Sequence, residues 1–458
     1  MSFSPELADV RFGCGLSPVI ASPASPLQLL TGLTGPDEVA ARFPIPTYAQ
    51  MNGWLTEAQR MRRAAFSQRD EPQLMDDLKA YRQAQKRTEH RWTAAAMLRQ
   101  AHSPTPFRER LVGFWADHFT AMGKIALLRT FAAPYIEEAI RPNIAGTFGD
   151  LLIAAVTHPV MLHYLDQDTS TGPNARATAR QKRLGGLNEN LAREVIELHT
   201  LGVDGPYTQT DVRELAELFT GLTYTIEEGF RFRPMWAEPG AETVLGRSYG
   251  GTPAQLEPVL QALRDLALHP ATAQHLARKL AVHFTADDPD PDLVAHVRAA
   301  YLASGGDLMR SYAALLEHPT AWTSPCRNVK PPADLVGSSW RALAVDPGVV
   351  AGLDVPDLRR AVVLPLAEMA QDWLRAPGPD GWPEEDAAWI TPQGLSARLR
   401  WAVNGPRLVC PELPDPRIFA DTALGPFATE TVRFAARAAE SRPEAIGLVL
   451  CSPAFQRR

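Results

Sequence analysis

The chain has 458 residues, enough to bury a large core, and its 45% hydrophobic and 21% charged content is ordinary for a globular protein. A net charge of −6 provides no basic surface for nucleic acid, and no run approaches the roughly 18 apolar residues of a membrane span. The four cysteines show no CxxC or metal-ligand spacing, and the first residues contain no apolar signal-peptide core. We therefore expect a cytoplasmic protein with reduced thiols, no nucleic-acid partner and no membrane span.

The expected elements are mainly helical and fall into four segments. Residues 1–50 form a loop-rich N-terminal segment, because Pro and Ser interrupt the apolar runs. Residues 51–221 form a helical N-terminal half, and residues 250–458 form a helical C-terminal half. Between them, the alternation in 222–249 predicts a small β-hairpin insertion. We predict a mainly α, large multi-helix globular protein that forms one unit of two poorly separated halves.

One apolar helix is expected to begin at Pro106. Leu111, Phe114, Trp115 and His118 follow at spacings of three and four, which places His118 on or beside the buried face. A histidine in such a position is usually a satisfied core residue, but its chemistry also suits a metal ligand or a proton shuttle.

Three histidine–proline steps, at His158, His269 and His318, each follow a short apolar run. Proline is favoured at the first position of a helix and pushes the preceding residue out of helical geometry. We predict that these histidines are junction residues, where one helix ends and the next begins.

Residues 167–186 form a long polar stretch with four basic side chains, Arg183 among them. Loops of this length without structure are commonly functional or mobile. Two interpretations stay open: a solvated excursion, or a basic flap over the acidic helix that follows or over an anionic substrate.

The stretch 188–221 carries the most informative polar pattern of the chain. On a helix that advances 100° per residue, Asn190, Glu194 and Glu197 share one face, while apolar side chains occupy another. An amide and two carboxylates are thus expected on one rigid helix face beside a turn.

The same stretch contains its own capping signals. Gly202 is expected to end the first helix, and Thr208 with Asp211 three residues later forms a capping-box pattern for the second. His199 lies at the end of the first helix, where the helix dipole favours it and backbone groups need partners.

The polar face allows three kinds of role. Two carboxylates one turn apart can bind a divalent metal ion, and His118 would add a nitrogen ligand. Crowded carboxylates can instead serve as a general acid or base. In the structural alternative, Arg193 pairs with Glu197 on the surface, and Glu194 pairs with an arginine of another helix such as Arg398. The spacing matches neither helical metal pattern, E-x-x-H or H-E-x-x-H.

Two further groups lie in the C-terminal half. His275, Lys279 and His283 are spaced by four, and a lysine between two histidines indicates a solvated helix face. Four tryptophans are dense around one Pro-rich loop: Trp373, Trp382, Trp389 and Trp401. Such tryptophans usually pin a loop to the protein body, and a stacking platform for a sugar or a peptide is the alternative.

The residues from Asn188 to Val212, NENLAREVIELHTLGVDGPYTQTDV, resemble the signature of the large bacterial family DUF1800, a domain of unknown function. The resemblance covers nearly the whole chain, from an R-F-G at residues 11–13, through a K-x-P element at Lys330, to an S-P-x-F-Q near residue 458. It implies a family rather than a reaction. Many relatives are exported, and many are encoded beside DUF1501 proteins, which are likened to sulfatases and phosphatases. A DUF1501-family protein is therefore the partner that the resemblance implies.

Four positions depart from that family pattern. Asp117 stands where Asn is usual, Ala237 where His is usual, Glu242 where Lys is usual, and Arg400 where Asn is usual. If these side chains belong to a family active site, the activity of this chain is altered.

Two functions are left open. The first is a metal-dependent or acid–base enzyme whose catalytic residues are Glu194, Glu197, His118 and Asn190, with one divalent ion bound by Glu194, Glu197 and His118. The candidate substrate-binding residues are Arg183, Lys330 and Arg398. The second is a non-catalytic binding or assembly protein whose Glu, Arg and Asn network is structural.

Overall fold

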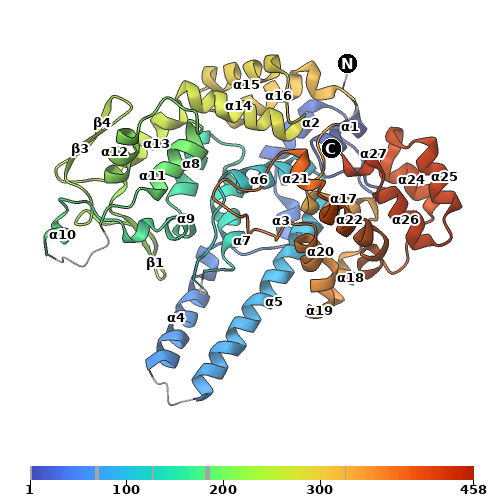
Figure 1. Cartoon of the computed structure of the whole chain (residues 1–458), viewed down its shortest axis with the longest axis horizontal. Coiled ribbons are helices and arrows are strands. Elements are labelled where there is room, and N and C mark those ends of the chain that lie inside the picture. Colours follow the sequence, from blue (N-terminus) through green and yellow to red (C-terminus); the bar gives the residue numbers. More distant parts are fainter. Residues whose placement is uncertain (1–2, 68–71, 126–127, 181–185, 325) are drawn as a thin grey trace.

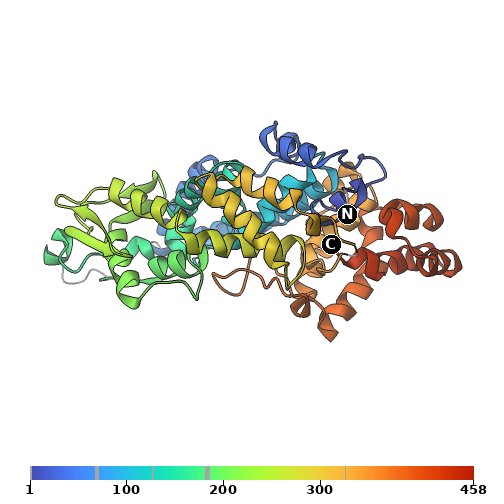
Figure 2. The same ribbon diagram turned by 90° about the horizontal axis from the view of Figure 1, so that it is seen from above.

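The computed structural model describes residues 3–67, 72–125, 128–180, 186–324 and 326–458. These residues form an elongated, mainly α molecule, as predicted, with two small antiparallel hairpins (Figures 1 and 2). None of the described helices combines the length and the apolar character needed to cross a membrane.

The N-terminal segment, expected to be loop-rich, contains three short helices. They are α1 (Pro5–Arg11), α2 (Pro26–Thr34) and α3 (Glu38–Arg42). Each begins after a side chain that accepts a hydrogen bond from a backbone N–H of the first turn, namely Ser4, Ser25 and Asp37.

Helices α4 (Asn52–Ser67) and α5 (Pro72–His102) form an antiparallel pair that projects from the body of the molecule (Figure 1). The Tyr81 hydroxyl donates to the Trp54 carbonyl at 2.8 Å and ties the pair together. The last turns of α5 enter the body and pack against α17 (Pro332–Ala342).

Helix α6 (Pro106–His118) begins at the predicted proline and crosses the larger hydrophobic core. Its Trp115 indole donates to the Tyr312 hydroxyl at 2.6 Å, which donates in turn to the Ile144 carbonyl at 2.9 Å. The other helices of this part are α7 (Ala132–Tyr135), α8 (Phe148–Val156), α9 (Pro159–Tyr164), α10 (Arg176–Arg180), α13 (Glu257–Ala267), α14 (Pro270–Phe284), α15 (Pro291–Ala303) and α16 (Leu308–Glu317).

The stretch 188–221 forms the expected pair of helices with one difference. Its elements are α11 (Asn190–Glu194), a π-helical turn (Val195–Thr200) and α12 (Gln209–Phe219). The predicted capping box of Thr208 and Asp211 is confirmed, and Gly202 ends the first helix with φ +89°. The wider π turn adds a residue to the helix repeat, so the side chains after Glu194 do not follow the 100° spacing.

The predicted hairpin region contains two hairpins. The strands are β1 (Leu222–Thr225), β2 (Gly229–Phe232), β3 (Gly240–Val244) and β4 (Arg247–Gly251). β1 pairs with β2, and β3 pairs with β4. Strand β3 packs on α12, which brings Glu242 next to that helix.

The end of α5 and the chain from α17 onward form a second hydrophobic core. Its further helices are α18 (Pro347–Gly352), α19 (Val355–Leu358), α20 (Leu364–Glu368), α21 (Asp386–Trp389), α22 (Pro392–Asn404), α23 (Pro406–Val409), α24 (Pro416–Leu424), α25 (Glu430–Ala438), α26 (Arg442–Leu450) and α27 (Pro453–Gln456). Helices α13 to α16 still pack in the first core. Along the chain, the change from the first core to the second therefore comes after α16, well beyond residue 250. The segment 369–385 between α20 and α21 reaches back to α6 as an irregular crossing loop (Figure 1).

The three histidine–proline steps are helix junctions, as predicted. The Nδ1 atoms of His158, His269 and His318 accept hydrogen bonds from the backbone N–H two residues later, at 3.2, 3.1 and 3.3 Å. Each histidine thus takes the place of the usual Ser or Asp cap in front of a proline.

Candidate active site

A cavity of about 180 Å³ lies where the two cores meet, between α6, α7, the end of α5, the start of α17 and the crossing loop. We call it the central cavity. Six aromatic side chains line it: Trp92, Phe114, Tyr135, Trp373, Trp382 and Trp389. Three of them are tryptophans of the Pro-rich loop, so that loop covers a cavity. Trp401 packs in the second core instead.

Helix α6 supplies one wall of the central cavity. Arg110, Gly113 and Asp117 line it at spacings of three and four, which is one face of a helix. A methyl group built on Gly113 would meet no atom within 4 Å. The cavity therefore extends up to the backbone of α6 at this residue.

Asp117 is held against the crossing loop. Its Oδ1 accepts a hydrogen bond from the Trp382 backbone N–H at 2.8 Å. Gly381 has φ +84°, and a Cβ there would lie 2.7 Å from Asp117 Oδ2, so the close approach requires glycine. The crossing loop and the Asp117 carboxylate are therefore in direct contact, through one hydrogen bond and one close approach.

The Asp117 carboxyl has a raised pKa. Burial raises this pKa to about 7 despite the Trp382 N–H, which favours the ionised form. Glu384 and Asp380 raise it further, whereas Lys279 lowers it. At neutral pH the group is therefore divided between its protonated and ionised forms.

The other charged side chains of the lining are paired. The ion pairs are Arg99 with Glu137 at 2.6 Å, Arg141 with Glu109 at 2.5 Å, Arg110 and Arg458 with Asp334, and Arg458 with Glu384 at 3.6 Å, to which His283 also donates a hydrogen bond at 2.7 Å. Asp117 has no ion-pair partner within 4.0 Å among the described residues. It is the uncompensated charge of the central cavity.

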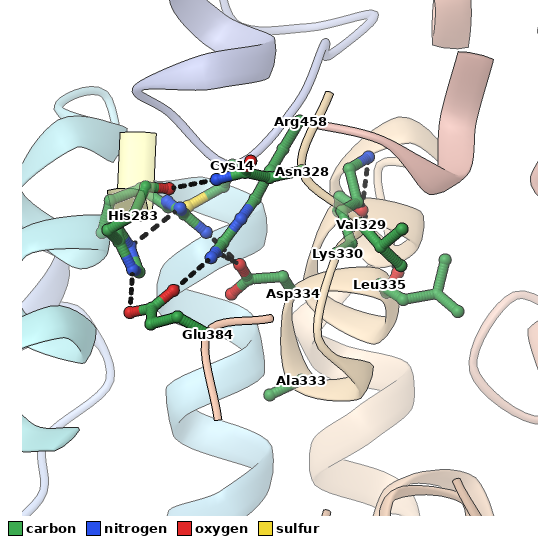
Figure 3. Close-up of polar contacts among 12 residues, drawn as sticks. Cys14, His283, Asn328, Val329, Lys330, Ala333, Asp334, Leu335, Glu384 and Arg458 are labelled. Atoms are coloured by element: carbon green, nitrogen blue, oxygen red, sulfur yellow. Dashed lines mark hydrogen bonds and ion pairs between the residues drawn. The ribbon is translucent and has the colours of Figure 1, made fainter. Parts of the chain in front are cut away.

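The floor of the cavity is a buried ionic network (Figure 3). Asp334 receives the guanidinium groups of Arg110 and Arg458, which overcome its burial and hold its pKa at about 2. His283 connects this network to Glu384: its Nδ1–H donates to Glu384 Oε1 at 2.7 Å, and its Nε2 accepts from Arg110 at 3.0 Å. Burial lowers the pKa of His283 to about 4, which keeps the ring in that neutral form.

Lys330, a predicted substrate-binding residue, lies beneath this floor. Its Nζ donates to Ser338 Oγ at 3.2 Å and lies 4.1 Å from the Phe455 ring centroid. Burial lowers the pKa of Lys330 to about 7. It lines a smaller adjoining cavity and not the central one.

Arg398, another predicted substrate-binding residue, is almost fully buried and supports its neighbours. It donates to the Lys330 carbonyl at 2.8 Å and to Gln456 Oε1 at 2.9 Å. It therefore does not form the pair with Glu194 that the structural alternative suggested. Arg183, the third candidate, lies outside the described residues.

We call α11 and the π-helical turn that follows it the signature helix. Part of its polar face forms ion pairs at the surface. Arg193 bonds to Glu197 at 3.2 Å, as the structural alternative expects, and to Glu189 at 3.0 Å. Asn190 is exposed. Glu194 is half-buried without an ion pair among the described residues, and burial, then Glu197 and Asp380, raise its pKa. Glu194 therefore shares with Asp117 the electrostatic influence of the crossing loop.

His118 is buried against the end of that helix. Its Nε2 donates to the His199 carbonyl at 3.2 Å, and burial lowers its pKa well below the ordinary value. Within the described ranges one set of three possible ligand atoms lies within 4.8 Å, and it is not Glu194, Glu197 and His118. In this geometry His118 caps the helix end and does not share a ligand shell with the two carboxylates.

The three-residue set consists of Glu214 and Glu217 on α12 and Glu242 on β3. Burial and the two neighbouring carboxylates raise the pKa of Glu242 to about 7. Arg213 pairs with Glu217 at 3.1 Å, but the described residues give Glu242 no cation. The position that departs from the family lysine thus completes an acidic cluster.

The prediction of a solvated face on α14 is wrong. His283 is buried, Lys279 and His275 are half-buried, and His275 donates to the Leu198 carbonyl at 3.1 Å. The stripe lies toward the signature helix, Asp117 and Glu384, which cover it in part. The spacing of four predicted correctly that these three residues share one face of α14. Their polarity alone did not predict how far other parts of the chain cover that face.

Sequence reasoning missed most of the central cavity. Asp117 lies one residue before His118, and its departure from the family asparagine was visible in the sequence. The ion pair of Arg110 with Asp334 joins residues 224 positions apart, and no local pattern signals it.

Comparison with known proteins gives one match. The family model described as "Protein of unknown function (DUF1800)" matches residues 21–457. No curated protein and no solved structure matches the chain.

Proposed function

The chain belongs to the DUF1800 family, and we propose that it is an acid–base enzyme whose active site is the central cavity. Asp117 is the residue that exchanges a proton with the substrate. The observation that carries this proposal is the position of an unpaired carboxyl in the lining of an aromatic cavity, with a pKa of about 7. A group with such a pKa can both accept and donate a proton near neutral pH.

The surroundings of Asp117 suit this role. Aromatic walls hold an organic substrate and restrict water, and the paired charges of the floor fix the geometry. The Trp382 N–H holds Asp117 Oδ1, so Oδ2 is the oxygen left to exchange the proton. Glu194 is a second carboxyl with a raised pKa and is influenced by the same Asp380, so it is a candidate relay to solvent.

Two earlier predictions remain alternatives. A metal-dependent enzyme would use Glu194, Glu197 and His118 with one divalent ion, after rearrangement of their side chains. The other alternative is a non-catalytic binding or assembly protein whose Glu, Arg and Asn network is structural, with a DUF1501-family partner implied by the resemblance; the pairing of Arg193 with Glu189 and Glu197 supports the structural role of that network. The cytoplasmic location likewise stays a prediction.

One experiment separates these functions. The full chain is incubated with pooled small organic metabolites, with and without a chelator, and consumption is followed by mass spectrometry. The acid–base proposal expects a compound whose turnover falls about 100-fold or more in Asp117→Asn and does not respond to the chelator. Equal turnover in Asp117→Asn would refute it, and loss with the chelator and in Glu194→Gln would favour the metal-dependent enzyme. The exposed Asp357→Asn is the matched control.

A further inference from the structure

The charge balance of the central cavity points to the kind of molecule that it binds. Five carboxylates and four arginines line it: Glu109, Asp117, Glu137, Asp334 and Glu384, and Arg99, Arg110, Arg141 and Arg458. His283 also lines the cavity but is neutral. Full ionisation of the carboxylates therefore leaves one negative charge, and it lies on Asp117.

The groups that face Asp117 do not remove this charge. Lys279 approaches from α14 but forms no ion pair within 4.0 Å among the described residues, and it does not line the cavity. Glu384 and Asp380 add negative charge from the crossing loop, and the Trp382 N–H is the one hydrogen-bond donor to the Asp117 carboxylate in the described chain. The missing partner is a cation that can reach the cavity side of the carboxylate.

The aromatic walls select among cations. Trp382 and Trp389 line the cavity with their ring centroids 6.0 Å apart, the Trp382 backbone N–H bonds to Asp117, and Phe114 and Trp373 also line the cavity. The faces of such rings attract ammonium groups within about 6 Å and also bury hydrocarbon. Mg²⁺ or Ca²⁺ instead requires six or more oxygen ligands and Zn²⁺ about four N, S or O ligands, and Asp117 belongs to no three-ligand set among the described residues.

The cavity is large enough for an organic molecule. Its volume of about 180 Å³ exceeds the roughly 150 Å³ of an engineered cavity that binds benzene. It therefore accommodates at least one ring together with an ammonium group.

We propose that the central cavity binds a small organic cation, an ammonium group on an apolar or aromatic body, with the ammonium against Asp117 and the tryptophan rings. This assignment rests on the proposed function, because it names the substrate class of the same site. It also explains why the cavity has one unpaired carboxylate: the ligand supplies the charge that completes the set.

The binding of such a cation depends on pH. The cation binds the ionised form of Asp117, whose pKa in the empty cavity is about 7. Affinity for a permanently charged quaternary ammonium is therefore expected to rise about tenfold from pH 5.5 to pH 7, and to level off above that. A cation held only by the rings would show no such rise.

The probe pair is (3-hydroxyphenyl)trimethylammonium and 3-tert-butylphenol, which differ by one positive nitrogen in place of carbon. Calorimetric titration of the full chain at pH 7 is expected to give at least tenfold tighter binding of the ammonium compound. Asp117→Asn should remove this preference and leave the affinity for the neutral phenol unchanged. The asparagine keeps an acceptor for the Trp382 N–H, so the loop contact is preserved.

Two cavity-filling variants locate the binding. Gly113→Leu and the larger Gly113→Trp project into the open space beside α6, and both should weaken both probes at least tenfold. Gly113→Ala, which keeps most of the space, should bind both.

The outcomes separate the two proposals. Equal affinity for the two probes, unchanged by Asp117→Asn but lost in Gly113→Leu, would overturn the cation assignment and leave the cavity as the binding site. Binding that survives in both Gly113 filling variants, or no binding of either probe, would overturn the cation assignment and the site together.

Discussion

Replacing Asp117 by asparagine is expected to make the fold less sensitive to pH. The pKa of Asp117 is about 7 in the folded chain and 3.8 in a solvated chain. The folded state therefore holds this proton more tightly than the unfolded state does. Ionisation of Asp117 costs stability, and this cost grows as the pH rises from about 4 to about 7.

The size of the effect follows from the two pKa values. Their difference corresponds to about 4 kcal/mol once Asp117 is fully ionised, at about 1.4 kcal/mol for each tenfold change. Roughly 2–3 kcal/mol of it develops between pH 5 and pH 8, and solvent in the cavity screens part. Asp117→Asn should therefore gain about 1–3 kcal/mol relative to the wild type over this range.

Urea denaturation followed by circular dichroism and tryptophan fluorescence at pH 5 and pH 8 measures this gain. Asp357→Asn, at an exposed pair with Arg360, should follow the wild type within about 0.5 kcal/mol. If the difference between Asp117→Asn and the wild type is the same at both pH values, Asp117 has an ordinary pKa and the reasoning about the cavity is refuted.

Three further predictions concern stability. Asp334→Asn leaves the buried Arg110 guanidinium without a counter-ion and Arg458 with Glu384 alone, at 3.6 Å, and should lower the free energy of unfolding by about 3–5 kcal/mol in urea at pH 7; a loss below about 1 kcal/mol would mean that the network is solvated. Glu242→Gln removes a carboxylate whose folded pKa is about 7, raised from 4.5, so it should stabilise the chain by about 1–3 kcal/mol at pH 8 and by little at pH 4.5; an equal effect at both would contradict the acidic cluster. Gly113→Ala, in the interior of α6 with free space at its Cβ, should raise the stability by about 1 kcal/mol in the same assay, and a loss would show that the cavity is closed there.

Local patterns predicted local structure well. The capping box of Thr208 and Asp211 and the histidine–proline junctions depend on residues two or three positions apart, so the sequence contains all of their partners. The mainly α fold follows from the same kind of signal. The π turn at Val195–Thr200 was missed because it shifts the helix phase without a change in composition.

The site depended on contacts between distant residues. Polarity suggested that Lys279 faces solvent, but Asp117 and Glu384, which is more than 100 residues later in the chain, lie near it, and Lys279 is half-buried. Trp382 was identified as part of a loop that packs on the body, and what the loop covers became visible only with α6 in place. Sequence could thus name the loop and the helices, and tertiary structure was needed to join them into a cavity.

The most direct test of the central claim is a crystal structure of the chain with (3-hydroxyphenyl)trimethylammonium. The account predicts the ligand in the central cavity, with its ammonium nitrogen within about 6 Å of the Trp382 ring centroid and in contact with the Asp117 carboxylate. A ligand bound elsewhere, or one in the cavity with its ammonium turned away from Asp117, would contradict it.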